Sequence, residues 1–90
     1  MGGVRERNVE LNIWININKI HGWKESMIDF NGKRFIELKD NIKKNGQKEP
    51  IIVRVETKTP NDIFFEGING KHRYFVMKQL GYKTIACVIE

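Results

Sequence analysis

The chain has 90 residues, a length that suits one domain, and we expect residues 1–90 to form a single domain. The apolar fraction of 40% and the nine aromatic residues argue against intrinsic disorder, and no apolar run approaches the roughly 18 residues of a membrane span. Residues 1–30 balance four basic against four acidic side chains, so the net charge of +5 lies in residues 31–90, where it suits either an anionic partner or solubility. We therefore expect a cytoplasmic protein that does not bind membranes.

The first predicted element is a β-strand over residues 9–17. Apolar side chains occupy every second position, and polar residues or tryptophan lie between them; the apolar positions are Val9, Leu11, Ile13, Ile15 and Ile17. A period of two is typical of a strand with one buried face. Residues 21–32, which hold Gly22 and Gly32, are predicted to form a loop or one short helical turn.

An amphipathic helix is predicted over residues 33–44, because Phe35, Leu38 and Ile42 recur at helical spacing. Asn31 is placed to cap its start, and Gly46 to adopt the left-handed conformation after its end. Basic residues dominate the outer face. Four of them are candidate contacts to nucleic acid: Lys33, Lys39, Lys43 and Lys44.

The second half of the chain predicts a hairpin, a helix and a strand. Residues 50–56 form a strand opened by Pro50, residues 57–62 a turn, and residues 63–67 the partner strand. A helix ends at Gly81, and the last strand buries the single cysteine, Cys87. The order β-α-β-β-α-β predicts an α/β fold with a small mixed sheet and two helices.

The segment "GINGKHR", residues 67–73, joins the second hairpin strand to the second helix. Asn69 can cap this helix, Gly70 lets the backbone approach a ligand, and Lys71, His72 and Arg73 lie in the first turn. Cations at a helix start oppose the helix dipole by about 0.3–1 kcal/mol each, so their presence indicates a bound anion. The alternative is a plain turn with Arg73 packed along the sheet edge.

Two side chains near this joint are candidates for catalysis. His72 can act as a general base or as a simple hydrogen-bond donor, and Glu66 lies close by. Asp62 and Glu66 could hold a metal beside a nucleotide, or could be a turn residue and a solvated one, and we predict no metal site of the protein's own. Trp14 and Trp23 could stack on a base, or could be covered by a helix or a second copy in a homodimer.

The motifs and their order resemble the ParB N-terminal domain and sulfiredoxin superfamily, over about residues 9–90. The matching positions are Asn45, Gly46, Pro50, Ile51, Gly70, Arg73, Leu80 and Gly81. Sulfiredoxins carry Gly-Cys-His-Arg-Tyr at the joint, where this chain has Gly70, Lys71, His72, Arg73 and Tyr74. Because Lys71 stands at the place of the catalytic cysteine, repair of sulfinic acids is not expected.

The resemblance implies that the joint, residues 69–73, holds nucleotide phosphates, with Arg34 as a further phosphate contact. It implies a ParB-like domain that binds a nucleotide, ATP or CTP with Mg²⁺, or DNA, in DNA segregation, regulation or mobile-element biology. An enzyme of the same superfamily, a nucleotide hydrolase, kinase or nuclease, is the alternative. The sequence leaves the choice between them open.

Overall fold

The computed structural model describes residues 12–90, apart from the side chains of Thr57 and Lys58. Its elements are strand β1 (Ile13–Asn16), the 3-10 turn η1 (Ile17–Lys19), β2 (Ile20–His21), the 3-10 turn η2 (Glu25–Met27), helix α2 (Lys33–Asn45), β3 (Ile51–Thr59), β4 (Asp62–Asn69), α3 (Lys71–Gln79) and β5 (Thr84–Ile89). Residues 9–11 of the predicted first strand lie outside the described residues.

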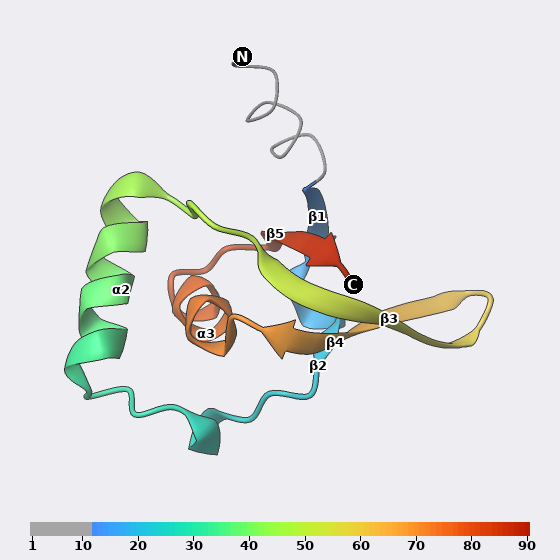
Figure 1. Cartoon of the computed structure of the whole chain (residues 1–90), viewed down its shortest axis with the longest axis horizontal. Helices are drawn as coiled ribbons and strands as arrows, with labels where there is room; N and C mark the ends of the chain where they lie inside the picture. Colours follow the sequence, from blue (N-terminus) through green and yellow to red (C-terminus); the bar gives the residue numbers. More distant parts are fainter. Residues whose placement is uncertain (1–11) are drawn as a thin grey trace, which may run out of the picture.

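The strands form one mixed sheet in the order β1-β5-β3-β4-β2. β3 and β4 make the predicted antiparallel hairpin, β5 runs parallel to β3, and β1 pairs antiparallel with β5. α3 lies between α2 and the sheet, and the hairpin extends away from both helices (Figure 1). The predicted α/β fold in the order β-α-β-β-α-β is confirmed, with the short β2 as an addition beside β4.

The first strand is shorter than its sequence pattern predicts. Asn16 accepts a hydrogen bond from the amide of Asn18 through its side chain (2.9 Å), and this contact opens the turn η1. Asparagine side chains compete with strand pairing in this way. Ile17 and Ile20 are then buried three positions apart, which is not the period of two of a strand. The alternation that continued to Ile17 therefore predicted too long a strand.

The core lies between the sheet and α3. Ile51, Val53, Ile85 and Cys87 from the sheet and Met77 from α3 have no exposed surface. From α2, the buried members of the core are residues 35 and 42. These contacts hold α3 against the sheet, and α2 packs on α3.

Only one of the two predicted ends of α2 is confirmed. Gly46 has a positive φ of 77° after the helix, and its amide donates to the Ile42 carbonyl oxygen (2.8 Å). The capping role of Asn31 is wrong, because Gly32 occupies the cap position and no side chain caps the helix. The Asn31 amide instead donates to Asp29 Oδ1 (3.1 Å).

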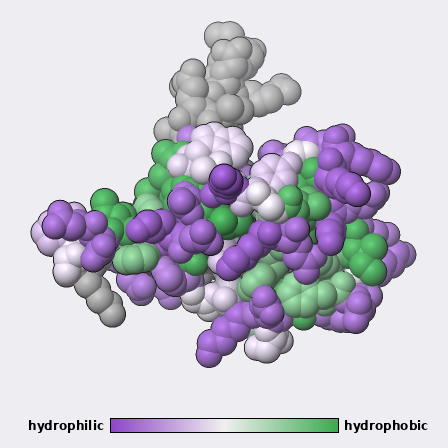
Figure 2. Space-filling view, turned by 180° about the vertical axis from the view of Figure 1, so that it is seen from behind, coloured by the Kyte–Doolittle hydropathy of each residue, from purple (hydrophilic) through white to green (hydrophobic). Residues whose placement is uncertain are grey.

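Hydrophilic residues cover most of the face in Figure 2, with apolar residues between them. The large apolar side chains that stay exposed include Val55 and Ile63 on the β3–β4 hairpin and Ile89 at the end of β5. No helix in the described part of the chain is long and apolar enough to cross a membrane.

Candidate phosphate-binding cleft

One cleft of about 1330 Å³ is lined by the beginnings of both helices. Its walls come from Gly22, Trp23 and Met27, from α2 as far as Asn41, and from the end of β4 with the first turn of α3. All six residues predicted to contact phosphate line it: Arg34, Asn69, Gly70, Lys71, His72 and Arg73. The fold therefore brings Arg34 to the joint from 35 positions or more earlier in the chain.

The first turn of α3 starts from a left-handed glycine. Gly70 has a φ of 108°, and the first helical hydrogen bond runs from the Tyr74 amide to the Gly70 carbonyl oxygen (3.0 Å). No side chain caps this end, so the predicted cap role of Asn69 is wrong; Asn69 is the last residue of β4. The amides before Tyr74 are the groups that a bound anion would accept from.

Gly70 also has a packing role. A Cβ at this position would lie 2.6 Å from Ile51 Cγ2 and 3.1 Å from Arg73 Nη1. Only glycine fits both this backbone conformation and this space. The missing side chain therefore makes room for the buried Ile51 and for the Arg73 guanidinium.

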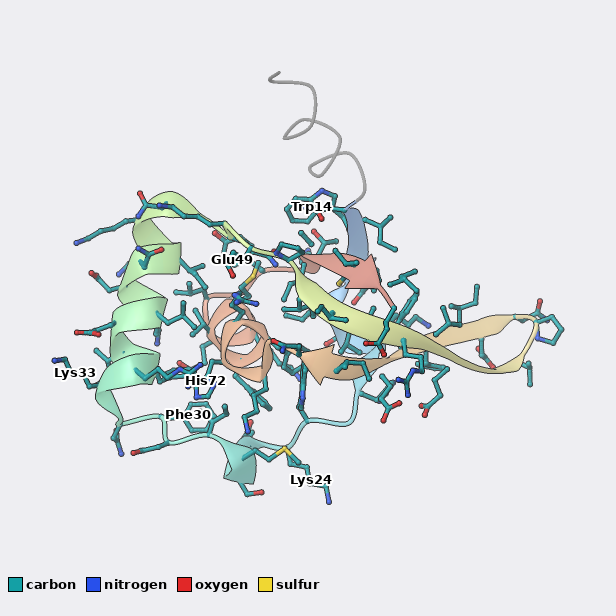
Figure 3. The ribbon with its side chains drawn as sticks, viewed as in Figure 1. Trp14, Lys24, Phe30, Lys33, Glu49 and His72 are labelled. Atoms are coloured by element: carbon teal, nitrogen blue, oxygen red, sulfur yellow. The ribbon has the colours of Figure 1, made fainter. Side chains whose placement is uncertain are left out.

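His72 lies between α2 and α3 in Figure 3. Burial, Arg34 and Lys71 hold the pKa of His72 below its ordinary value of 6.5, in that order of importance. The imidazole is therefore neutral at neutral pH and sits beside two cations. A neutral imidazole can donate one hydrogen bond, and an anion placed among these groups would favour its protonated form.

Arg73 lines the cleft and is also held by contacts to another segment of the chain. Its guanidinium donates to the Pro50 carbonyl oxygen (3.3 Å) and to Glu49 Oε2 (3.0 Å). Its side chain is 25% exposed, whereas that of Glu49 is 73% exposed. The guanidinium thus ties the first turn of α3 to the segment that precedes β3, the central strand, whereas the predicted alternative placed Arg73 along the sheet edge.

The two catalytic candidates, Glu66 and His72, line the same cleft. The Glu66 carboxylate lies 3.8 Å from Arg54, which also contacts Glu90 at 2.7 Å. Asp62 lies away from the cleft, at the start of β4 beside the hairpin turn, where its carboxylate accepts from the Thr59 hydroxyl (3.3 Å). Among residues 12–90, no three His, Cys, Asp or Glu side chains are grouped as a metal site would require.

Most of the lysines of α2 lie outside the cleft. Of the four predicted nucleic-acid contacts, only Lys33 lines it, and Lys33 lies 3.9 Å from Glu37 in an exposed pair. Lys39 donates to Gln79 (2.9 Å), and Lys44 pairs with Asp40 (3.2 Å). Lys43 is exposed on the same helix.

Sequence reasoning missed the pairing of Trp23 with Gly67. A Cβ on Gly67 would lie 2.7 Å from three atoms of the indole, so the ring packs directly on the strand. Trp23 also contacts Tyr74 (5.4 Å between ring centroids) and lines the cleft. The available signal was a glycine inside an otherwise bulky strand. Trp14, in contrast, is 63% exposed on β1.

Comparison with known proteins gives one family and a set of similar folds. The family model described as the ParB N-terminal domain matches residues 4–90. The structure is similar to sulfiredoxin from Arabidopsis thaliana, with 26% identity and a TM-score of 0.68 over 88% of this chain and 83% of that one. No curated protein matches the sequence.

Two further similar structures contain nucleotides. A C-terminally truncated chromosome-partitioning protein ParB from Caulobacter crescentus, complexed with CTP-gamma-S, has 19% identity and a TM-score of 0.67 over 88% of this chain. A free serine kinase in complex with AMP has 18% identity and a TM-score of 0.63, also over 88%. The present chain spans 43% of that ParB chain and 30% of the kinase chain.

Proposed function

Since the chain belongs to the ParB N-terminal domain family, we propose that its cleft binds the phosphates of a nucleotide, ATP or CTP. The observation that carries the proposal is the meeting of two uncapped helix starts in one cleft. Neither α2 nor α3 has an acidic residue in its first turn or a side-chain cap. Both helix dipoles therefore favour an anion at this place.

Two cations of the cleft are available to such an anion. Arg34 and Lys71 line the cleft and take part in none of the ion pairs found among residues 12–90. They come from different helices, and both lie near enough to His72 to lower its pKa. A phosphate group between them would neutralise positive charge that the protein leaves uncompensated.

The similar structures favour a nucleotide over a free phosphate ion. One contains CTP-gamma-S and another AMP on the same fold. The cleft also has an aromatic wall, Trp23, next to its cationic part, and such a wall suits a base. A nucleotide-binding ParB-like domain would serve DNA segregation, regulation or a mobile element.

Calorimetric titration with ATP and CTP, with and without Mg²⁺, tests the proposal. Arg34→Gln and Lys71→Gln should each weaken binding by about 10-fold or more, because a hydrogen bond to a charged group contributes about 1.5–3 kcal/mol. Lys43→Gln is the matched control, since Lys43 is exposed on α2 and does not line the cleft. Failure of the wild type to bind either nucleotide, or an equal loss in Lys43→Gln, would contradict the proposal.

Duplex DNA is the second ligand to titrate. If several lysines along α2 contact DNA phosphates, the logarithm of the binding constant should fall with the logarithm of the salt concentration, with a slope of roughly −0.9 per phosphate neutralised. Each lysine substitution should then make this slope less steep by about one unit. We expect a weak salt dependence, because Lys33, Lys39 and Lys44 already have partners within the protein. A steep slope that Lys43→Gln reduces would favour DNA instead.

A further inference from the structure

The contact between Arg73 and Glu49 is unusual within the cleft, because it joins a cleft cation to a carboxylate outside it. Glu49 Oε2 lies 3.0 Å from Arg73 Nη2, and Glu49 does not line the cleft. Figure 3 shows Glu49 on the connection between α2 and β3, beside α3. The Glu49 carboxylate therefore pairs with a guanidinium from the same helix turn as Lys71 and His72.

The guanidinium lies against the helix start itself. Its Nη1 atom is 3.1 Å from the point where a Cβ of Gly70, the residue at the N-cap position of α3, would stand, and Arg73 lines the cleft. A guanidinium has five N–H donors. In Arg73, Nη1 donates to the Pro50 carbonyl oxygen and Nη2 donates to the Glu49 carboxylate. An anion at the helix start and the Glu49 carboxylate would therefore draw on one and the same positive charge.

The two partners differ in how firmly they are held. Arg73 is mostly covered, and its second contact, to the Pro50 carbonyl oxygen, is to the backbone. Glu49 is 73% exposed, so its carboxylate can return to water at little cost. Exchange of partners would thus move the glutamate and leave the arginine in place.

The backbone around Glu49 is fixed independently. The Gln47 side chain donates to the Ala86 carbonyl oxygen (2.9 Å) and accepts from the Ala86 amide (2.8 Å), which clamps the connection to β5. The same side-chain nitrogen of Gln47 donates to the Glu49 carbonyl oxygen (2.9 Å). Release of the Glu49 carboxylate therefore requires no opening of the segment.

We propose that Glu49 is an internal competitor of phosphate for Arg73, and this inference rests on the proposed function of the cleft. A phosphate at the start of α3 takes over the guanidinium, and the Glu49 side chain swings into solvent. Glu49 thereby sets the affinity of the cleft for oxyanions. A purely structural tie would behave differently, because its removal would loosen the helix start and weaken binding.

The test compares Glu49→Gln with Asp40→Asn in titrations with ATP and CTP at one ionic strength. Both changes remove one exposed carboxylate that pairs with a cation, but Asp40 pairs with Lys44 on α2, and neither residue lines the cleft. Glu49→Gln should bind about 2- to 5-fold more tightly than Asp40→Asn, the range expected when an exposed ion pair stops competing. Urea unfolding of both variants verifies that each is folded.

The outcomes separate the two proposals. Binding by the wild type, with Glu49→Gln equal to or weaker than Asp40→Asn, overturns the competitor role and leaves the proposed function standing. Absence of ATP and CTP binding by the wild type and both variants overturns both. A selective gain in Glu49→Gln supports both.

Discussion

Replacing Gly70 with alanine should destabilise the protein far more than an ordinary glycine substitution. The left-handed conformation of Gly70, with φ 108°, costs an L-residue about 1–2 kcal/mol. The new Cβ would also lie 2.6 Å from Ile51 Cγ2 and 2.9 Å from Ile51 Cβ, inside the core, where overpacking costs about 1–3 kcal/mol. Together these give a loss of about 2–5 kcal/mol in the free energy of unfolding, measured by urea denaturation.

Gly81→Ala is the matched control, because Gly81 also has a positive φ (85°) but no atom within 4 Å of its Cβ position. It should lose only the conformational part, about 1–2 kcal/mol. Adding Ile51→Ala to Gly70→Ala should cost less than Ile51→Ala alone, because the nearer of the two crowding atoms, Ile51 Cγ2, is gone while Cβ remains. Equal losses in Gly70→Ala and Gly81→Ala, or strict additivity in the double variant, would refute the packing role of Gly70.

Two further predictions concern titratable groups. The pKa of His72 in the free protein lies below 6.5, and a bound phosphate would raise this pKa, so that nucleotide binding takes up a proton. The affinity for the nucleotide should therefore increase as the pH is lowered from about 8 to about 6. His72→Gln should lose this part of the pH dependence; an unchanged profile would contradict the placement of His72. The same lowered pKa means that the unfolded state binds the extra proton, so the contribution of His72 to stability should fall as pH drops below 6.5, which urea unfolding of wild type and His72→Gln will show. Cys87 is fully buried and its pKa is raised to about 12, so a disulfide reagent should modify it only after unfolding, and the protein should not repair a sulfinylated peroxiredoxin. Repair activity that disappears in Cys87→Ala would contradict this.

Most of the fold could be predicted because local pattern and tertiary structure agree. The spacing of Phe35 and Ile42 and the glycines at 46 and 81 mark helices that the core then stabilises. The first strand was overstated because the Asn16 side chain forms a local hydrogen bond that a hydropathy pattern does not report. The predictions that the side chains of Asn31 and Asn69 cap helix starts were wrong for a related reason: Gly32 and Gly70 hold the cap positions, and capping depends on backbone angles.

The sequence predicted which residues line the candidate site better than it predicted the contacts that those residues make. The joint at residues 69–73 is contiguous in sequence, and the fold gathers it with Arg34 in one cleft. The partners of Arg73, the Pro50 carbonyl oxygen and Glu49, lie 23 and 24 positions earlier and carry no local signal. The indole of Trp23 on Gly67 is likewise a contact that only the packed chain reveals.

The most direct test of the central claim is an amide NMR titration of the ¹⁵N-labelled protein with CTP and with ATP. Binding at the cleft predicts the largest shifts at Gly70, Lys71, His72 and Arg73, with a second group at the start of α2 around Arg34. The β3–β4 hairpin turn, near Asp62, should stay unchanged and serves as the internal reference. No shifts with either nucleotide, or shifts centred on the hairpin with the joint unaffected, would contradict the account.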